Sequence, residues 1–179
     1  IPSTLKVLSF THKNYGSGTF NWEQLVDPAI KIMREGFIVG PFRQKAFGHY
    51  GLDLKSQKEA KEIFFKENGQ AYQVGDRFRQ PKLAKTLGRI AKNGADDFYT
   101  GEIAKEIAAD MAANGGWITE EDLANFPDPK VVPAISSSYR GHEVITLPPP
   151  FGGWIMLQIL NLLELSDQDT VDQDDAKRR

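Results

Sequence analysis

Apolar residues between positions 3 and 125 recur at helical spacing, in short runs that glycine, asparagine and proline separate. Such runs predict a series of short helices. Ser3 is a candidate N-cap for the first helix, and Asn21 is a candidate N-cap for the second. Pro28 predicts a fresh helix start that Gly36 ends, because proline fits the first turn of a helix.

Two further signals lie before position 80. Ser56, with Glu59 three residues later, predicts a capping box at a helix start. The pair Asn68-Gly69 lies between the apolar runs 63–65 and 71–74, and tight two-residue turns favour this pair. The sequence therefore predicts a small β-hairpin here.

Three more helices are predicted between Pro81 and Asn125. One runs from Pro81 to Gly94, and a second runs from Gly101 to Asn114 with a left-handed cap at Gly115. A short third helix begins at Thr119.

After Pro133 the pattern changes from helical to alternating. Residues on both sides of Arg140-Gly141 alternate in polarity, so we expect a β-hairpin near residues 134–147. Gly152-Gly153 then predicts a sharp bend, and the apolar run Trp154–Leu165 predicts a helix.

The fold class that follows is mainly α with a small β component (α+β). We expect one mostly helical segment over residues 1–165. Residues 166–179 form a polar tail that we expect to be disordered, because it has only one large apolar residue.

Composition excludes several classes of protein. The net charge of -2 and the scattered basic residues give no concentrated positive field, so we expect neither nucleic-acid nor anionic-membrane binding. The absence of cysteine excludes a disulfide framework, a thiolate metal site and a cysteine nucleophile. Trp154–Leu165 is too short to span a bilayer, and the chain opens at Ile1 without a signal peptide. We interpret it as a chain whose start was removed or as an excised segment.

Candidate chemical residues are few. The histidines His12, His49 and His142 are far apart and form no helical ligand pair, so we predict no metal site and no cofactor. Two groups of carboxylates lie where helix starts favour negative charge, and we interpret them as caps: Asp96-Asp97 and Glu120-Glu121-Asp122.

The serines and the glycine pairs also give no clear indication of a catalytic or binding site. Ser136 to Ser138 lie in a predicted strand and not in a nucleophile elbow. Gly115-Gly116 is interpreted as a helix stop, whereas Gly152-Gly153 is either a structural bend or a close approach to a ligand or another chain. We therefore assign no catalytic, cofactor-binding or metal-binding residue.

The order of several motifs nevertheless resembles one family. The stretches Asp97–Ala104, Asn114–Ala124 and Tyr139–Val144, then Pro148–Pro150 with Gly152-Gly153, resemble the large subunit of the γ-glutamyltransferase (γ-glutamyltranspeptidase) family. The resemblance extends from Ile1 to about Leu165. It implies that the strands near 134–147 belong to the αββα sandwich of an N-terminal-nucleophile hydrolase.

The resemblance also implies a mechanism whose reacting parts lie elsewhere. In this family a precursor cuts itself, and the threonine exposed at the small subunit's new N-terminus becomes the nucleophile, with its own α-amine as base. The substrate is a γ-glutamyl amide such as glutathione. This sequence contains no Thr-Thr pair of the family's nucleophile motif, and Arg34-Glu35 is not the equivalent of the family's substrate-binding Arg-Glu.

We therefore interpret the chain as a non-catalytic piece of such an enzyme, whose partner is the small subunit of the same precursor. Pro148 to Gly153 departs from the family's usual sequence because it is one residue shorter and lacks two serines. A β-lactam side-chain acylase and a stand-alone helical binding module remain alternatives. We also expect the chain alone to associate with itself through Trp154–Leu165. Its compartment is unknown, although members of this family are often periplasmic, secreted or on the cell surface.

Overall fold

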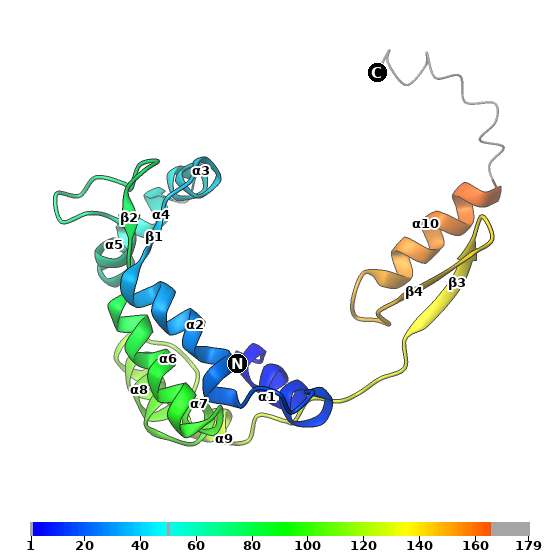
Figure 1. Cartoon of the computed structure of the whole chain (residues 1–179), viewed down its shortest axis with the longest axis horizontal. Coiled ribbons are helices and arrows are strands. Elements are labelled where there is room, and N and C mark those ends of the chain that lie inside the picture. Colours follow the sequence, from blue (N-terminus) through cyan, green and yellow to red (C-terminus); the bar gives the residue numbers. More distant parts are fainter. Residues whose placement is uncertain (1, 50, 166–179) are drawn as a thin grey trace, which may run out of the picture. The chain divides into compact units, whose positions relative to one another are not determined.

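The computed structural model describes residues 2–49 and 51–165 (Figure 1). The chain divides into two compact units, residues 1–129 and residues 130–179, where the sequence analysis expects one segment over residues 1–165. The tail 166–179, which we expect to be disordered, lies outside the described residues.

The first unit is built around two long helices, α2 (Trp22–Glu35) and α6 (Pro81–Asn93), which lie along each other (Figure 1). Each helix repeats apolar residues on one face, and the two faces form a shared core. This core consists of Ile30, Ala84 and Ala91, with Val26, Met33 and Leu87 packed against it. The indole nitrogen of Trp22 donates a hydrogen bond of 3.0 Å to the Ile90 carbonyl, which fixes one end of the pair.

The predicted helix start at Pro28 is wrong, because Pro28 lies inside α2. The helix begins with a capping box, in which the side chains of Asn21 and Gln24 each accept from the other's backbone N–H. Proline removes one hydrogen bond from the interior of a helix, but the apolar face of α2 continues on both sides of it and packs against α6. Tertiary packing therefore outweighs the local signal. The helix ends at Gly36, whose φ of 83° suits a residue without a side chain.

A second core of the first unit is aromatic. It consists of Val39, Phe47 and Phe78, with Phe37, Ile63, Phe64 and Tyr72 packed against it. Most of these residues come from a two-stranded antiparallel sheet, β1 (Phe37–Ile38) with β2 (Arg77–Phe78), and from the helices α3 (Pro41–His49) and α5 (Lys58–Phe64). Val39 directly follows β1, and Tyr72 lies in the connection between α5 and β2. Helix α4 (Gly51–Ser56) connects α3 with α5.

Two predictions in this region need correction. The hairpin predicted at Asn68-Gly69 is a single bridge between Phe65 and Ala71, because residues 63 and 64 end helix α5 instead of forming a strand. The capping box predicted at Ser56 is also wrong. Helix α5 begins at Lys58 with Gln57 in the N-cap position, and Ser56 is the last residue of α4.

The remaining helices of the first unit are α1 (Thr4–Tyr15), α7 (Asp96–Tyr99), α8 (Glu102–Ala113) and α9 (Glu120–Ala124). Their bounds agree with the predicted caps at Ser3, Gly115 and Thr119. Tyr99, Ile103 and Leu123 are buried and join α7, α8 and α9, whereas α1 has no buried residue.

The second unit is a β-hairpin covered by one helix. Strands β3 (Ile135–Tyr139) and β4 (His142–Thr146) pair antiparallel, and Tyr139 lies opposite His142. Arg140 and Gly141 between them have φ values of 49° and 77°, as a type I′ turn requires. Helix α10 (Gly153–Leu165) packs on β3 (Figure 1).

The described part of the chain is thus mostly helical with two small sheets, which confirms the predicted α+β class. Within the same residues, no helix has both the length and the apolar character needed to cross a membrane.

Candidate functional site

The histidines lie on separate elements. His12 lies in α1, where its Nε2 is 3.0 Å from the Phe20 carbonyl oxygen and its ring lies 5.8 Å from the ring of Trp22. His142 is the exposed first residue of β4, and His49 is the last residue of α3. Among residues 2–49 and 51–165, no three His, Asp or Glu side chains are grouped to hold a metal ion. His12 therefore holds a loop beside its own helix.

Asp97 is a buried carboxylate that holds a helix start. Its Oδ1 accepts a 3.0 Å hydrogen bond from the backbone N–H of Glu102, at the start of α8. Its Oδ2 lies 3.4 Å from Nε of Arg89, whose Nη1 contacts Glu106 at 2.8 Å. A Cβ added to Gly101 would lie 2.2 Å from the Asp97 Oδ1, so a side chain there would displace the cap.

The carboxylates at the start of α9 also act as a cap. Asp122 Oδ2 accepts hydrogen bonds from the backbone N–H and the hydroxyl of Thr119, at 2.9 and 2.7 Å. Thr119 Oγ1 in turn accepts from the backbone N–H of Asp122 at 3.1 Å. These hydrogen bonds, first the one from the hydroxyl, lower the pKa of the Asp122 carboxyl. Asp97 and Asp122, one residue from each group, thus have the capping role that the sequence predicts.

The two glycine pairs differ in what approaches them. Gly115 has a φ of 73°, and the backbone N–H of Gly116 donates to the Met111 carbonyl, so this pair ends α8. Gly153 begins α10 where the helix passes close to the hairpin. A Cβ on Gly153 would lie 2.3 Å from Thr146 Oγ1 and 2.4 Å from the Leu147 carbonyl oxygen. The close contact of Gly153 is therefore with the chain's own hairpin, which agrees with the structural bend and leaves the alternative of a ligand or another chain untested.

The three serines lie in β3. The hydroxyl of Ser137 contacts Asn161 Oδ1 of α10 at 2.9 Å. Ser136 and Ser138 alternate with it and are exposed. A hydroxyl in this place joins the hairpin to the helix and has no base beside it, so the arrangement is structural.

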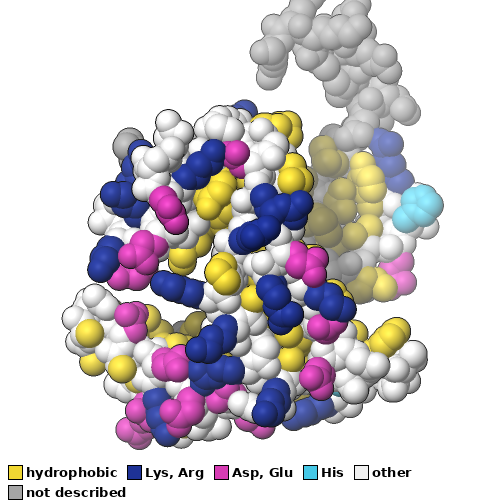
Figure 2. Space-filling view, turned by 60° about the vertical axis from the view of Figure 1, so that its left-hand side comes forward, with side chains coloured by type: hydrophobic (Ala, Val, Ile, Leu, Met, Phe, Trp, Pro, Cys, Tyr) yellow, Lys and Arg dark blue, Asp and Glu magenta, His cyan; other side chains and the backbone are white. Residues whose placement is uncertain are grey.

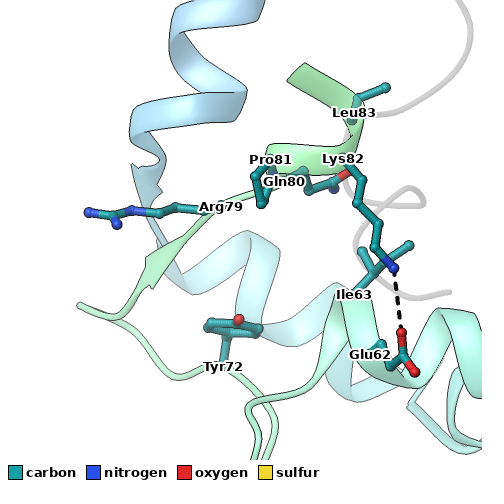
Figure 3. Close-up of a pocket in the computed structure, with 8 residues that line it drawn as sticks. All are labelled: Glu62, Ile63, Tyr72, Arg79, Gln80, Pro81, Lys82 and Leu83. Carbon is teal, nitrogen blue, oxygen red and sulfur yellow. Dashed lines mark ion pairs between the residues drawn. The ribbon is translucent and has the colours of Figure 1, made fainter. Parts of the chain in front are cut away.

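A hollow of about 410 Å³ lies between α5 and the start of α6 (Figure 3). Its lining comprises Glu62, Ile63, Tyr72, Arg79, Gln80, Pro81, Lys82 and Leu83. Lys82 and Glu62 form an ion pair of 3.5 Å on one side, and the side chain of Arg79 points away from that pair (Figure 3). The lining contains no Ser, Thr, Cys or His, so it offers neither a nucleophile of those types nor an imidazole base.

Charges of both signs are mixed on the face of the molecule that Figure 2 shows. Figure 2 shows Lys and Arg side chains interleaved with Asp and Glu over the face in view.

Helix α10 is the least covered element of the second unit. Of its large apolar residues only Leu157 is buried, while Ile155, Ile159 and Leu162 are 46%, 52% and 67% exposed. Its polar residues instead contact the hairpin. Glu164 Oε1 accepts a 2.7 Å hydrogen bond from the backbone N–H of Arg140, and Asn161 contacts Ser137. Sequence reasoning missed these two contacts, because polarity alone does not tell which face of a helix is covered.

The sequence of this chain is similar to the sequences of known proteins over most of its length. The chain matches the family described as gamma-glutamyltranspeptidase over residues 1–178. It is 43% identical over 168 residues to the glutathione hydrolase proenzyme of Escherichia coli K12, covering 93% of this chain and 28% of that protein. The glutathione hydrolase proenzyme of Bacillus subtilis is 36% identical, with 94% of this chain and 29% of that protein covered.

Solved structures agree with this match. The gamma-glutamyltranspeptidase of Helicobacter pylori is 36% identical and superposes with a TM-score of 0.89 over 97% of this chain and 49% of that chain. The cephalosporin acylase of Bacillus halodurans is 31% identical, with a TM-score of 0.81 over 92% of this chain and 31% of that chain. The chain therefore spans less than a third of the length of the two curated relatives.

Proposed function

Because this chain belongs to the gamma-glutamyltranspeptidase family, we propose that it is a non-catalytic piece of the large subunit of a γ-glutamyl-transferring or γ-glutamyl-hydrolysing enzyme. The observation that carries the proposal is the match over residues 1–178 together with the 0.89 TM-score at 36% identity. Identity at this level extends over the whole described chain and not only over one motif.

The proposed reaction takes place on residues outside this chain. A threonine at the new N-terminus of the small subunit attacks the γ-glutamyl amide, and its α-amine accepts the proton. The C–N bond of the amide breaks, the amine leaves with that proton, and the γ-glutamyl group stays on the threonine as an ester. This group is then transferred to water or to an amino acid, which releases the threonine hydroxyl. The polar groups of this chain support the proposal, since Asp97, Asp122 and Ser137 hold backbone or side-chain groups of the chain itself.

The substrate class that we propose is a glutathione-like γ-glutamyl amide. The curated relatives described above are glutathione hydrolase proenzymes. The rival substrate is a β-lactam side chain, because a cephalosporin acylase is also similar in structure. Assays of the intact precursor with a γ-glutamyl amide and with an acylated cephalosporin distinguish the two.

The partner that we propose is the remaining chain of the same precursor, including its small subunit. It would cover the apolar side of α10, where Ile159 and Leu162 are exposed. Each large apolar side chain gains about 1.5–3 kcal/mol when it is fully buried, so a helix of this kind favours a covered state.

The test is turnover of a chromogenic γ-glutamyl anilide. We expect none from this chain alone, because it lacks the nucleophile, and we expect turnover from a precursor that contains the downstream threonine. The matched control is that precursor with the threonine replaced by alanine. Activity that stays with the isolated chain through extensive purification would refute the proposal, and an inactive precursor without a downstream threonine would favour a stand-alone binding module.

A further inference from the structure

The two ends of the first unit meet at one lysine. Lys6 lies in the first turn of α1, and its Nζ donates a hydrogen bond to the carbonyl of Phe126. The same Nζ lies 3.3 Å from Oδ1 of Asp128. Residues 125–128 follow α9 and lead out of the unit, and we call them the strap. One side chain near the beginning of the unit thus contacts the segment at its end.

Two stacked aromatic rings lie beside the same ammonium group. The rings of Tyr99 and Phe126 are nearly parallel, with an angle of 6° and a centroid distance of 6.0 Å. Lys6 Nζ lies 5.3 Å from the first centroid and 5.7 Å from the second. Both distances are within the range of cation–π attraction. The ammonium therefore contacts a carbonyl, a carboxylate and two rings.

Tyr99 joins the cluster to the start of the chain. Its hydroxyl donates a 2.8 Å hydrogen bond to the Pro2 carbonyl and accepts a 3.1 Å hydrogen bond from the backbone N–H of Lys6. The residue is only 3% exposed, and its burial raises the pKa of its hydroxyl. Helix α1, which has no buried residue, is thus held at this point by polar contacts.

The carbonyl and the rings hold the lysine more than the carboxylate does. The side chain of Lys6 is 20% exposed, whereas that of Asp128 is 86% exposed. An ion pair with a partner so open to water contributes little, while contacts that are shielded from water are stronger. Beyond Phe126, no backbone-to-backbone hydrogen bond holds residues 127–134 in the described part of the chain.

We propose that the contacts of the Lys6 ammonium with Phe126, Asp128 and the ring of Tyr99 hold the strap reversibly against α1, and we call these contacts the clasp. When it is closed, the strap lies against α1 and Tyr99, and the free connection to the hairpin unit begins after Asp128. When it is open, the strap and α1 are released together, Tyr99 loses its cover, and the connection begins after Ala124, where α9 ends. The clasp thereby sets the length of free chain before the hairpin.

The first test uses the unmodified 179-residue chain. An amine-reactive reagent labels lysines at rates that follow their access to water, and mass spectrometry reads the rate at each site. Lys13, exposed on the same helix, is the matched internal control. We expect Lys6 to react at least about tenfold more slowly than Lys13, because labelling requires local opening. Equal rates would overturn the proposal.

The second test compares three variants by hydrogen exchange. We expect Lys6→Met to speed exchange of the hydrogen-bonded amides of Lys6, Val7, Asn125 and Phe126 at least about tenfold, while α2 and α6 keep their protection. Lys6→Arg, which keeps the cation, should retain most of the protection, and Lys13→Met should change nothing. Unchanged exchange of the strap in Lys6→Met, or an equal increase over the whole unit, contradicts a clasp. If Lys6→Met does not fold, the labelling rates of the unmodified chain decide.

Discussion

Asp97 begins one of the stretches by which the sequence resembles its family, and its carboxylate accepts from a backbone N–H instead of facing a substrate. Gly101 is explained by the same contact, since a side chain there would overlap the carboxylate. Thr119 and Asp122 satisfy each other's backbone N–H groups in the same way. At the scale of residues, the capping contacts of helix starts therefore explain polar residues in two of these stretches, Asp97–Ala104 and Asn114–Ala124.

Asp122 offers a test of this view through pH. Its pKa lies below the usual aspartate value, so the carboxylate stabilises the folded chain above that usual value and loses this effect as the pH falls through the lowered pKa. We expect Thr119→Ala to return the pKa toward the ordinary value, because the hydroxyl is the first cause of the shift. An NMR titration of the carboxyl carbon measures it. If the pKa of Asp122 is the same in Thr119→Ala as in the unsubstituted chain, the hydroxyl of Thr119 does not stabilise the carboxylate as a cap.

At the scale of elements, the sequence predicted correctly those helices and turns that are stabilised by contacts between residues close together in the sequence. Helices α6, α8 and α9 and the β3–β4 turn are marked by caps or turn residues next to them in sequence. Strands β1 and β2 have two residues each and pair across about 40 positions, so no local pattern marks them. The helix start predicted at Pro28 was wrong because the rule considers only neighbouring residues. The packing of α2 on α6, which stabilises a helix that continues through Pro28, depends on residues far away in the sequence.

The candidate site shows the same limit. The capping role of the carboxylates could be predicted because each cap lies within five residues of the N–H groups that it holds. The contacts of Lys6 with Phe126 could not be predicted, since 120 positions separate the two residues.

Gly153 tests the contact between α10 and the hairpin. We expect Gly153→Ala to lower the free energy of unfolding of this unit by about 1–3 kcal/mol, because the added methyl group overlaps Thr146 and the backbone of residue 147. Gly152→Ala is the matched control, since a Cβ there meets nothing within 4 Å. Hydrogen exchange of β4 and α10 under mild denaturant measures both. Equal effects of the two substitutions would show that the close approach does not matter.

At the scale of the whole molecule, the second unit exposes large apolar side chains along α10. From the sequence we expect the chain to associate with itself through Trp154–Leu165, and the structure leaves Ile159 and Leu162 more than half exposed. Since Asn161 and Glu164 contact the hairpin, the exposed side of α10 consists mainly of apolar residues. Without a partner, such a surface favours association between copies.

Association of the chain with itself is the corresponding prediction. We expect light scattering at micromolar concentration to give a mass above the 20.0 kDa of one chain. The double substitution Ile159→Glu and Leu162→Glu should weaken association at least about tenfold, because it places charge on the contact surface. Val7→Glu, at a residue of α1 that is 45% exposed, is the control. A strict monomer of the unsubstituted chain would contradict the prediction.

The division of the chain at Pro129 has a consequence in time. A protein leaves the ribosome N-terminal end first, and the internal contacts of the helical unit need only residues 1–129. At a synthesis rate of about 5–20 residues per second, residue 129 is added to the chain roughly 2–10 seconds before residue 179. Phe126 and Asp128 are among its last residues to emerge, and they are the residues that Lys6 holds. The contacts of Lys6 with the strap can therefore form only when synthesis of the helical unit is nearly complete. At that stage the apolar side of α10 is not yet buried against a partner.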